Sequence, residues 1–172
     1  KALAGLEKRP SLTSRPELEA MRLETSGTLA DHLEPGEMTR LDDWWDQLIA
    51  SSVMQDFSAV LTHHDFWYEN LLVGGEPPRL SGVLDWEHVR LSDPVVDLVP
   101  LTYLDVGFAE EVMTAYKNHG GTVDDSFRVR FANHRVLREF GGIRYSIRHN
   151  DRVELVASID KLRQTRVTDA RR

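Results

Sequence analysis

The chain has 172 residues, with 21 Lys and Arg against 28 Asp and Glu, and a formal net charge of -7. This acidic balance disfavours non-specific binding to nucleic acid or to an anionic membrane. The absence of cysteine excludes disulfides, thiolate metal sites and a cysteine nucleophile. No apolar run approaches the roughly 18 to 20 residues that span a bilayer. We therefore expect a cytoplasmic protein of about one domain, without nucleic-acid or membrane partners.

Apolar residues at helical spacing predict most of the secondary structure. Between residues 49 and 108 the helical pattern gives way to short apolar strands. In the later helical part of the chain, Gly141-Gly142 is expected to interrupt or kink a helix. The predicted helical segments, in chain order, are a short start within 1–13, then 15–33, 38–49, 108–116, 127–140 and 151–164.

Three short apolar runs in the middle of the chain predict β-strands. They lie at residues 59–62, 70–73 and 80–85. The Gly74-Gly75-Glu-Pro-Pro78 turn between the second and third runs is typical of a β-hairpin. The sequence thus predicts an α+β fold that is mainly helical, with a small central β-hairpin.

Polar residues around this hairpin are the candidates for chemistry. Asp85 ends an apolar strand, where a carboxylate is costly to desolvate unless a charged or hydrogen-bonding group meets it. Asp65 and Asn70 flank a loop between two strands. Two carboxylates and an amide oxygen are ligands that suit Mg²⁺, which typically takes one or two carboxylates together with substrate phosphate.

Simpler interpretations exist for each of these residues. An isolated Asp before a loop is most often a turn or cap residue. A zinc-like site that uses both His63 and His64 is disfavoured, because adjacent side chains in extended chain point to opposite sides. This argument also weighs against a metal-dependent hydrolase built on His63, His64 and Asp65.

Three motifs in order resemble the aminoglycoside phosphotransferase and choline kinase-like family. Thr62-His-His-Asp-Phe-Trp-Tyr-Glu-Asn-Leu-Leu-Val73 is similar to its catalytic loop, and Gly82-Val-Leu-Asp-Trp-Glu87 to its metal-binding strand end. Ser92-Asp-Pro-Val-Val-Asp-Leu98 resembles the segment that follows. The resemblance implies the C-terminal lobe of a protein kinase-like fold.

The resemblance also implies roles for individual residues. Asp65 would orient the acceptor hydroxyl and accept its proton, while Asn70 and Asp85 would hold the Mg²⁺ that bridges the phosphates of ATP. His63 would support the loop without acting as an acid or base.

Further residues are assigned supporting roles by the same resemblance. Asp93 and Asp97 would tie their segment back to the catalytic loop through hydrogen bonds. Leu72 and Leu84 would form the floor of an adenine pocket.

Two positions depart from the pattern of the family. His64 and Ser92 stand where glycine is common. Neither position is a metal ligand or the base, and His64 is expected to be a packed or solvated neighbour.

The sequence-based hypothesis is an ATP- and Mg²⁺-dependent phosphotransferase acting on a hydroxyl of a small molecule, such as an aminoglycoside-like antibiotic or a related amino alcohol. The acidic charge slightly favours a cationic acceptor. A nucleotide loop and strand lysine are not found, so residues 1–172 are expected to form only the C-terminal lobe, with the N-terminal nucleotide lobe absent from this chain. The alternative is a non-catalytic kinase-like binding or regulatory module, against which the presence of Asp65, Asn70 and Asp85 weighs.

Overall fold

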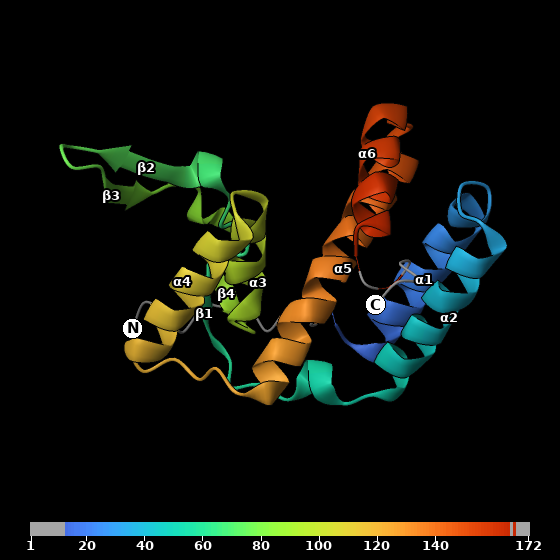
Figure 1. Ribbon diagram of the computed structural model, residues 1–172, viewed down its shortest axis with the longest axis horizontal. Coiled ribbons are helices and arrows are strands. Elements are labelled where there is room, and N and C mark those ends of the chain that lie inside the picture. The colour runs from blue at the N-terminus through green and yellow to red at the C-terminus, as the bar shows by residue number, and fades with distance from the viewer. Residues whose placement is uncertain (1–12, 166, 168–172) are drawn as a thin grey trace. The chain divides into compact units, whose positions relative to one another are not determined.

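The computed structural model describes residues 13–165 and 167, which form two compact units (Figure 1). Residues 57–131 make up the strand-bearing unit. Residues 13–56 and 132–165, with residue 167, make up the helical unit. The expected helical start before residue 13 lies outside the described residues.

The helical unit is an assembly of helices around one apolar core. Leu18, Leu41, Trp45 and Phe140 are among its fully buried side chains, and Trp45 meets Phe140 edge to face at 4.7 Å between ring centroids. Aromatic pairs in this geometry add to the free energy gained from burial. The elements of this unit are α1 (Arg15–Ala30), α2 (Pro35–Ala50), η1 (Val53–Gln55), the larger part of α5 (Asp125–His149) and α6 (Arg152–Arg163).

The strand-bearing unit holds two small antiparallel sheets and the segments that join them. β2 pairs with β3, as the hairpin prediction required, and β1 pairs with β4. Figure 1 shows the β2–β3 hairpin extending away from α3 and α4. The elements are β1 (Val60–Thr62), η2 (Tyr68–Asn70), β2 (Leu71–Gly74), β3 (Arg79–Val83), η3 (Trp86–His88), β4 (Arg90–Ser92), α3 (Val95–Leu98), η4 (Val99–Tyr103) and α4 (Val106–Asn118).

The core of the strand-bearing unit lies beside its short helices. Val95, Leu101, Met113 and Phe127 are buried there, so α3, η4, α4 and the start of α5 pack together. Asp124 caps α5, because its Oδ1 accepts a hydrogen bond of 2.8 Å from the Phe127 amide.

Several features differ from the sequence-based prediction, among them the helical turns α3 and η4, which were not predicted. β4 was not predicted, since three residues with only one apolar side chain carry little strand signal. The expected interruption at Gly141-Gly142 was wrong, because α5 continues through both residues. Gly142 faces Ser158 of α6 so closely that a Cβ would collide with the serine hydroxyl. This glycine therefore permits close packing of two helices within the helical unit.

Among the described residues, no helix has both the length and the apolar character needed to cross a membrane.

Candidate functional site

Asp65 and Asn70 lie against each other in the loop between β1 and β2. The Asn70 side-chain amide donates hydrogen bonds to the Asp65 backbone oxygen at 2.9 Å and to its carboxylate Oδ2 at 3.1 Å. The loop closes through further backbone hydrogen bonds around Trp67. The five-residue spacing thus brings one carboxylate and one amide to the same place, and the orientation of the Asn70 amide leaves its Oδ1 available as an acceptor.

Asp85 lies two residues after the end of β3, and the residue before it, Leu84, is paired with Asn70. The Leu84 amide donates to the Asn70 backbone oxygen at 2.8 Å, which extends the β2–β3 pairing to the residue before Asp85. Asp85 itself adopts a left-handed backbone conformation, with φ 62° and ψ 60°, which Asp tolerates better than most residues. Its carboxylate is exposed and finds no hydrogen-bond or ion-pair partner among the described residues.

His63 is buried and connects the loop to β3. Its Nδ1 accepts a hydrogen bond from the Asp65 amide at 3.3 Å, so the ring proton lies on Nε2, which donates to the Leu84 backbone oxygen at 2.7 Å. Both ring nitrogens are therefore engaged in holding backbone. This arrangement is that of a structural histidine that ties the two halves of the site together.

Asp97 of α3 holds the start of the loop through two backbone amides. Its two carboxylate oxygens accept hydrogen bonds from the amides of His63 at 2.7 Å and His64 at 2.8 Å. Burial raises the pKa of the Asp97 carboxyl, and the two amide hydrogen bonds act in the opposite direction. The expected tie between this segment and the loop is thus found at Asp97.

The same expectation for Asp93 was wrong. Its carboxylate forms a buried ion pair with Arg130 of α5 at 2.6 Å and accepts from the Val95 amide at 3.1 Å, and neither partner belongs to the loop. Burial raises the pKa of Asp93, while Val95 and Arg130 lower it. Arg130 also lies over the rings of Phe57 and Phe127 at 5.7 and 5.8 Å. Arg130 was missed by sequence reasoning, because a charged residue inside a helix gives no sign that it is buried.

His64 is a packed neighbour of the loop. It adopts a left-handed conformation with φ 70°, which explains why glycine suits this position. Its Nε2 is buried without a hydrogen-bond partner among the described residues. Burial lowers the pKa of its imidazole to about 4, and the nearby charges of Arg90 and His88 add to this effect. By contrast Ser92, the other departure from glycine, pairs with Val60 in a regular strand where glycine is not required.

Leu72 and Leu84 present one exposed apolar face of the hairpin. Leu72 is 45% and Leu84 47% exposed. Leu72 is paired with Gly82 and lies over it, and Gly82 shares a face with Leu84 two residues later.

The donor set matches a magnesium ion that is shared with a phosphate-bearing ligand. Among residues 13–165 and 167, no three His, Asp or Glu side chains are arranged to hold a metal by themselves. The unpartnered carboxylate of Asp85 and the Oδ1 of Asn70 are both hard oxygen donors. Two such donors fit Mg²⁺, which usually keeps several waters or phosphate oxygens as its other ligands.

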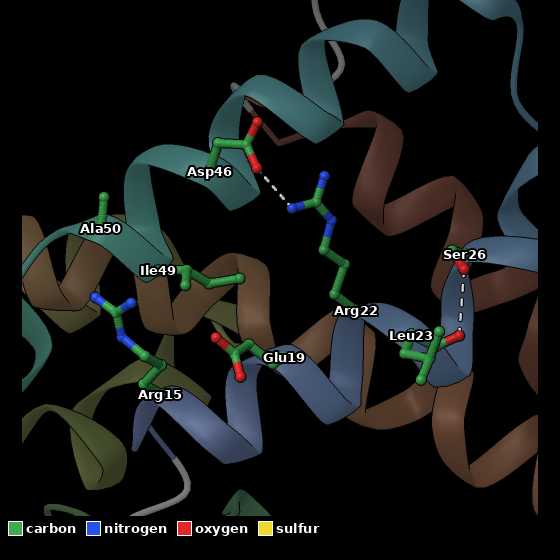
Figure 2. Close-up of a pocket in the computed structure, with 8 residues that line it drawn as sticks. All are labelled: Arg15, Glu19, Arg22, Leu23, Ser26, Asp46, Ile49 and Ala50. Atoms are coloured by element: carbon green, nitrogen blue, oxygen red, sulfur yellow. Dashed lines mark hydrogen bonds and ion pairs between the residues drawn. The ribbon is translucent and has the colours of Figure 1, made fainter.

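A separate hollow of about 490 Å³ lies in the helical unit, between α1 and α2 (Figure 2). Arg22 crosses it and forms ion pairs with Asp46 at 2.6 Å and Asp42 at 2.9 Å. None of the predicted site residues lines this hollow.

The chain is similar in sequence and in fold to known phosphotransferases. Viomycin phosphotransferase of Streptomyces vinaceus is 28% identical over 120 residues, which are 68% of this chain and 40% of that protein. The solved GDP and kanamycin complex of APH(2")-IIia has a TM-score of 0.75 and 17% identity, with 93% of this chain and 54% of that chain covered. For macrolide 2'-phosphotransferase type I the TM-score is 0.65 and the identity 18%, with 92% and 51% covered.

The chain therefore spans 40% of this curated relative and about half of the solved structures. The similarity in fold confirms the predicted fold class, a mainly helical C-terminal lobe of a protein kinase-like fold with a small β-hairpin. The sequence matches the phosphotransferase enzyme family over residues 1–140, and the chain belongs to this family.

Proposed function

We propose that this chain is the catalytic lobe of an ATP- and Mg²⁺-dependent phosphotransferase that acts on a hydroxyl group of an antibiotic-like small molecule. The observation that carries the proposal is the hydrogen bond from the Asn70 amide to the Asp65 carboxylate. Together with the backbone hydrogen bond from Leu84 to Asn70, it brings Asp65, Asn70 and the strand end at Asp85 to one edge of the unit.

Asp65 is the proposed base. Its carboxylate is exposed, and its backbone is held by Asn70 and His63, so the side chain can meet an acceptor hydroxyl without rearrangement of the loop. A positioned base of this kind typically accelerates proton removal by about 10² to 10⁴.

Asn70 and Asp85 are the proposed metal ligands. When bound, Mg²⁺ would neutralise the charge of the transferred phosphate. The hydrogen bonds donated by the Asn70 amide direct its Oδ1 away from Asp65, and the Asp85 carboxylate has no competing partner among the described residues. Both groups can therefore bind a cation without first breaking an internal interaction.

Leu72 and Leu84 are the proposed floor of the nucleotide base pocket. Their exposed apolar side chains suit a purine ring, and a structure of similar fold was solved with GDP. ATP is the expected phosphate donor, and GTP is the natural second donor to test.

The N-terminal nucleotide lobe remains a further proposal. The relatives are about twice as long as this chain, so we expect full activity from a protein in which this chain is joined to a nucleotide-binding lobe. The 172-residue chain alone should bind ATP weakly and turn it over slowly. Tight ATP binding by the chain alone would contradict the need for a second lobe.

The test is phosphoryl transfer from labelled ATP and GTP to viomycin, kanamycin and a macrolide, measured on the longer protein with Mg²⁺ and with a chelator. We expect transfer only with Mg²⁺, and a loss of about 100-fold or more in Asp85→Ala. Asp43→Ala, which removes an exposed carboxylate of α2, is the matched control and should remain active.

Two outcomes would contradict the proposal. Full activity in Asp85→Ala would exclude the metal assignment. A folded protein without any Mg²⁺-dependent transfer would favour the non-catalytic module instead.

A further inference from the structure

The indole of Trp86 connects the end of β3 to the loop that follows β1. Its Nε1 donates a hydrogen bond of 2.9 Å to the backbone oxygen of Val83, so the side chain reaches back across Asp85. Its ring meets that of His63 edge to face, with 4.7 Å between the ring centroids and 65° between the planes. Trp86 therefore contacts both of the chain segments that the proposed site joins.

Trp86 is not part of the hydrophobic core. Its side chain is 50% exposed, and it is neither among the buried core residues of the strand-bearing unit nor among the partly buried residues packed against them. An indole gains most of its free energy of packing from burial, and much of that gain is given up here. The hydrogen bond to Val83 and the contact with His63 are thus the interactions that this side chain contributes.

The backbone of Asp85 depends on such contacts. Its φ of 62° and ψ of 60° lie in the left-handed region, which is unfavourable for a residue with a Cβ. Its own carboxylate has no hydrogen-bond or ion-pair partner among the described residues, so it does not hold this conformation itself. In an ordinary helical or extended conformation the same carboxylate would point elsewhere, because side-chain direction follows the backbone.

Two consecutive peptide groups before Asp85 are held by two different side chains. The Val83 oxygen accepts from the Trp86 indole, and the Leu84 oxygen accepts from His63 Nε2 at 2.7 Å. The bond to Leu84 fixes the peptide plane that precedes Asp85, because a peptide group moves as a unit. The bond to Val83 ties the residue after Asp85 to the strand end before it. Together the two bonds restrain the chain on both sides of Asp85.

We propose that Trp86 is a positioning residue for the metal site, because its indole N–H and its ring hold Asp85 in the conformation from which the carboxylate would bind Mg²⁺ together with Asn70. This inference rests on the proposed function, which takes Asp85 as a metal ligand, and it adds the side chain that keeps this ligand in place. The indole acts on metal binding and not on the transfer step. A higher concentration of Mg²⁺ should therefore compensate for its loss.

The test measures metal binding separately from activity. Binding of Mn²⁺, a paramagnetic substitute for Mg²⁺, is followed by electron paramagnetic resonance on the longer protein with a non-hydrolysable ATP analogue. Trp86→Phe keeps a ring beside His63 and loses the N–H donor, and because the position is half-exposed the variant should stay folded. We expect Mn²⁺ to bind about five- to tenfold more weakly, since the left-handed conformation of Asp85 is then less populated. Trp86→Leu, which loses both contacts, should weaken Mn²⁺ binding by about tenfold or more.

Transfer activity gives the second measurement. Trp86→Phe should need about five- to tenfold more Mg²⁺ for its half-maximal rate, in proportion to its weaker Mn²⁺ binding. At saturating Mg²⁺ its kcat should return to within about twofold of the value for the unaltered protein, because an interaction that acts only on metal binding does not change the rate of the fully loaded enzyme.

Trp44→Phe is the matched control. The Trp44 indole also donates a hydrogen bond to an oxygen, the Oδ1 of Asn133 at 3.1 Å, but it lies in the helical unit. The same substitution therefore removes a comparable bond away from the proposed metal ligands, and Mn²⁺ binding should be unchanged. Thermal denaturation of both variants checks that each remains folded.

The inference is overturned if Trp86→Phe binds Mn²⁺ as the unaltered protein does, or if Trp44→Phe weakens binding to the same extent. It is also overturned if saturating Mg²⁺ does not restore kcat in Trp86→Phe, because the indole would then have a general structural role. In each of these cases the proposed phosphotransferase is kept.

Failure of the proposed function has a different result. An unaltered protein that binds no Mn²⁺ with the nucleotide would remove the metal assignment itself, and the inference with it. Weaker Mn²⁺ binding in Trp86→Phe, in a protein that transfers no phosphate, would keep the inference and remove the phosphotransferase.

Discussion

Replacement of His64 by glycine should stabilise the strand-bearing unit near neutral pH. Two features of the folded state are unfavourable at this residue. Its φ of 70° costs a side chain with a Cβ about 1 to 2 kcal/mol, and its buried, unpartnered Nε2 costs about 1 to 3 kcal/mol. Glycine removes both costs.

Opposing effects reduce the gain. Glycine has more conformational freedom in the unfolded chain, which costs about 0.5 to 1 kcal/mol, and the burial of the imidazole ring is lost. We therefore expect a net increase of about 1 kcal/mol in the free energy of unfolding of His64→Gly at pH 7.5.

The gain should grow as the pH falls. The pKa of His64 is about 4 in the folded protein, against an ordinary value of 6.5. Between these values the unfolded chain takes up a proton that the folded chain does not, so the histidine lowers stability progressively from pH 6.5 to pH 4. The full pKa difference would correspond to roughly 3 kcal/mol, and because His64 is only partly buried we expect about 1 to 2 kcal/mol.

Urea denaturation at pH 7.5 and pH 5.0, followed by circular dichroism, measures both effects. Comparison of the variant with the unaltered protein at each pH cancels the contribution of other titrating groups. These include Asp93 and Asp97, whose carboxyl pKa values are raised by burial. His64→Asn is the matched variant, because Asn tolerates a positive φ and does not titrate. The reasoning is refuted if His64→Gly is less stable at pH 7.5, or if its advantage does not increase at pH 5.0.

Two further substitutions test the supports of the site and the packing of the helical unit. Asp97→Asn should lower kcat by about tenfold or more with little change in acceptor KM, because an amide side chain accepts a hydrogen bond from only one of the two loop amides. An unchanged kcat would show that the loop does not depend on this contact. Gly142→Ala should lower the free energy of unfolding by about 1 to 2 kcal/mol, because the new methyl group collides with Ser158. Gly141→Ala, which has open space around it, should raise the free energy of unfolding by about 0.5 to 1 kcal/mol. Thermal denaturation of the two variants measures both effects, and equal effects would contradict the packing argument.

The proximity of Asp65 and Asn70 could be predicted because it depends on short spacing. A separation of five residues within the loop between two strands leaves little freedom, and the hairpin then brings the end of β3 back to the same edge. The helices could be predicted from their apolar spacing for a similar reason, since each pattern is local in the sequence.

The partner of Asp93 could not be predicted in this way. Arg130 lies 37 residues later, and its pairing depends on how α5 packs within the strand-bearing unit. A carboxylate in a motif can equally hold a loop or a distant helix, and the sequence pattern does not distinguish the two. The need for glycine at position 142 inside α5 is a case of the same kind, because it depends on the approach of Ser158 from another helix.

Backbone conformation was the other property that the sequence pattern did not reveal. Among the described residues, three that are not glycine have positive φ values: Asn150, directly after the end of α5, where such a conformation is common, and His64 and Asp85, next to the proposed base and at the proposed metal ligand. At His64 and Asp85, local preference alone would favour other conformations. The hydrogen bonds from the His64 amide to Asp97 and from His63 to Leu84 hold the chain on either side of these residues. Strain of this kind persists only where the surroundings enforce it, and it is concentrated at functional sites. The two such positions that are not at a helix end thus support, independently of the motifs, the placement of the site at the ends of β1 and β3.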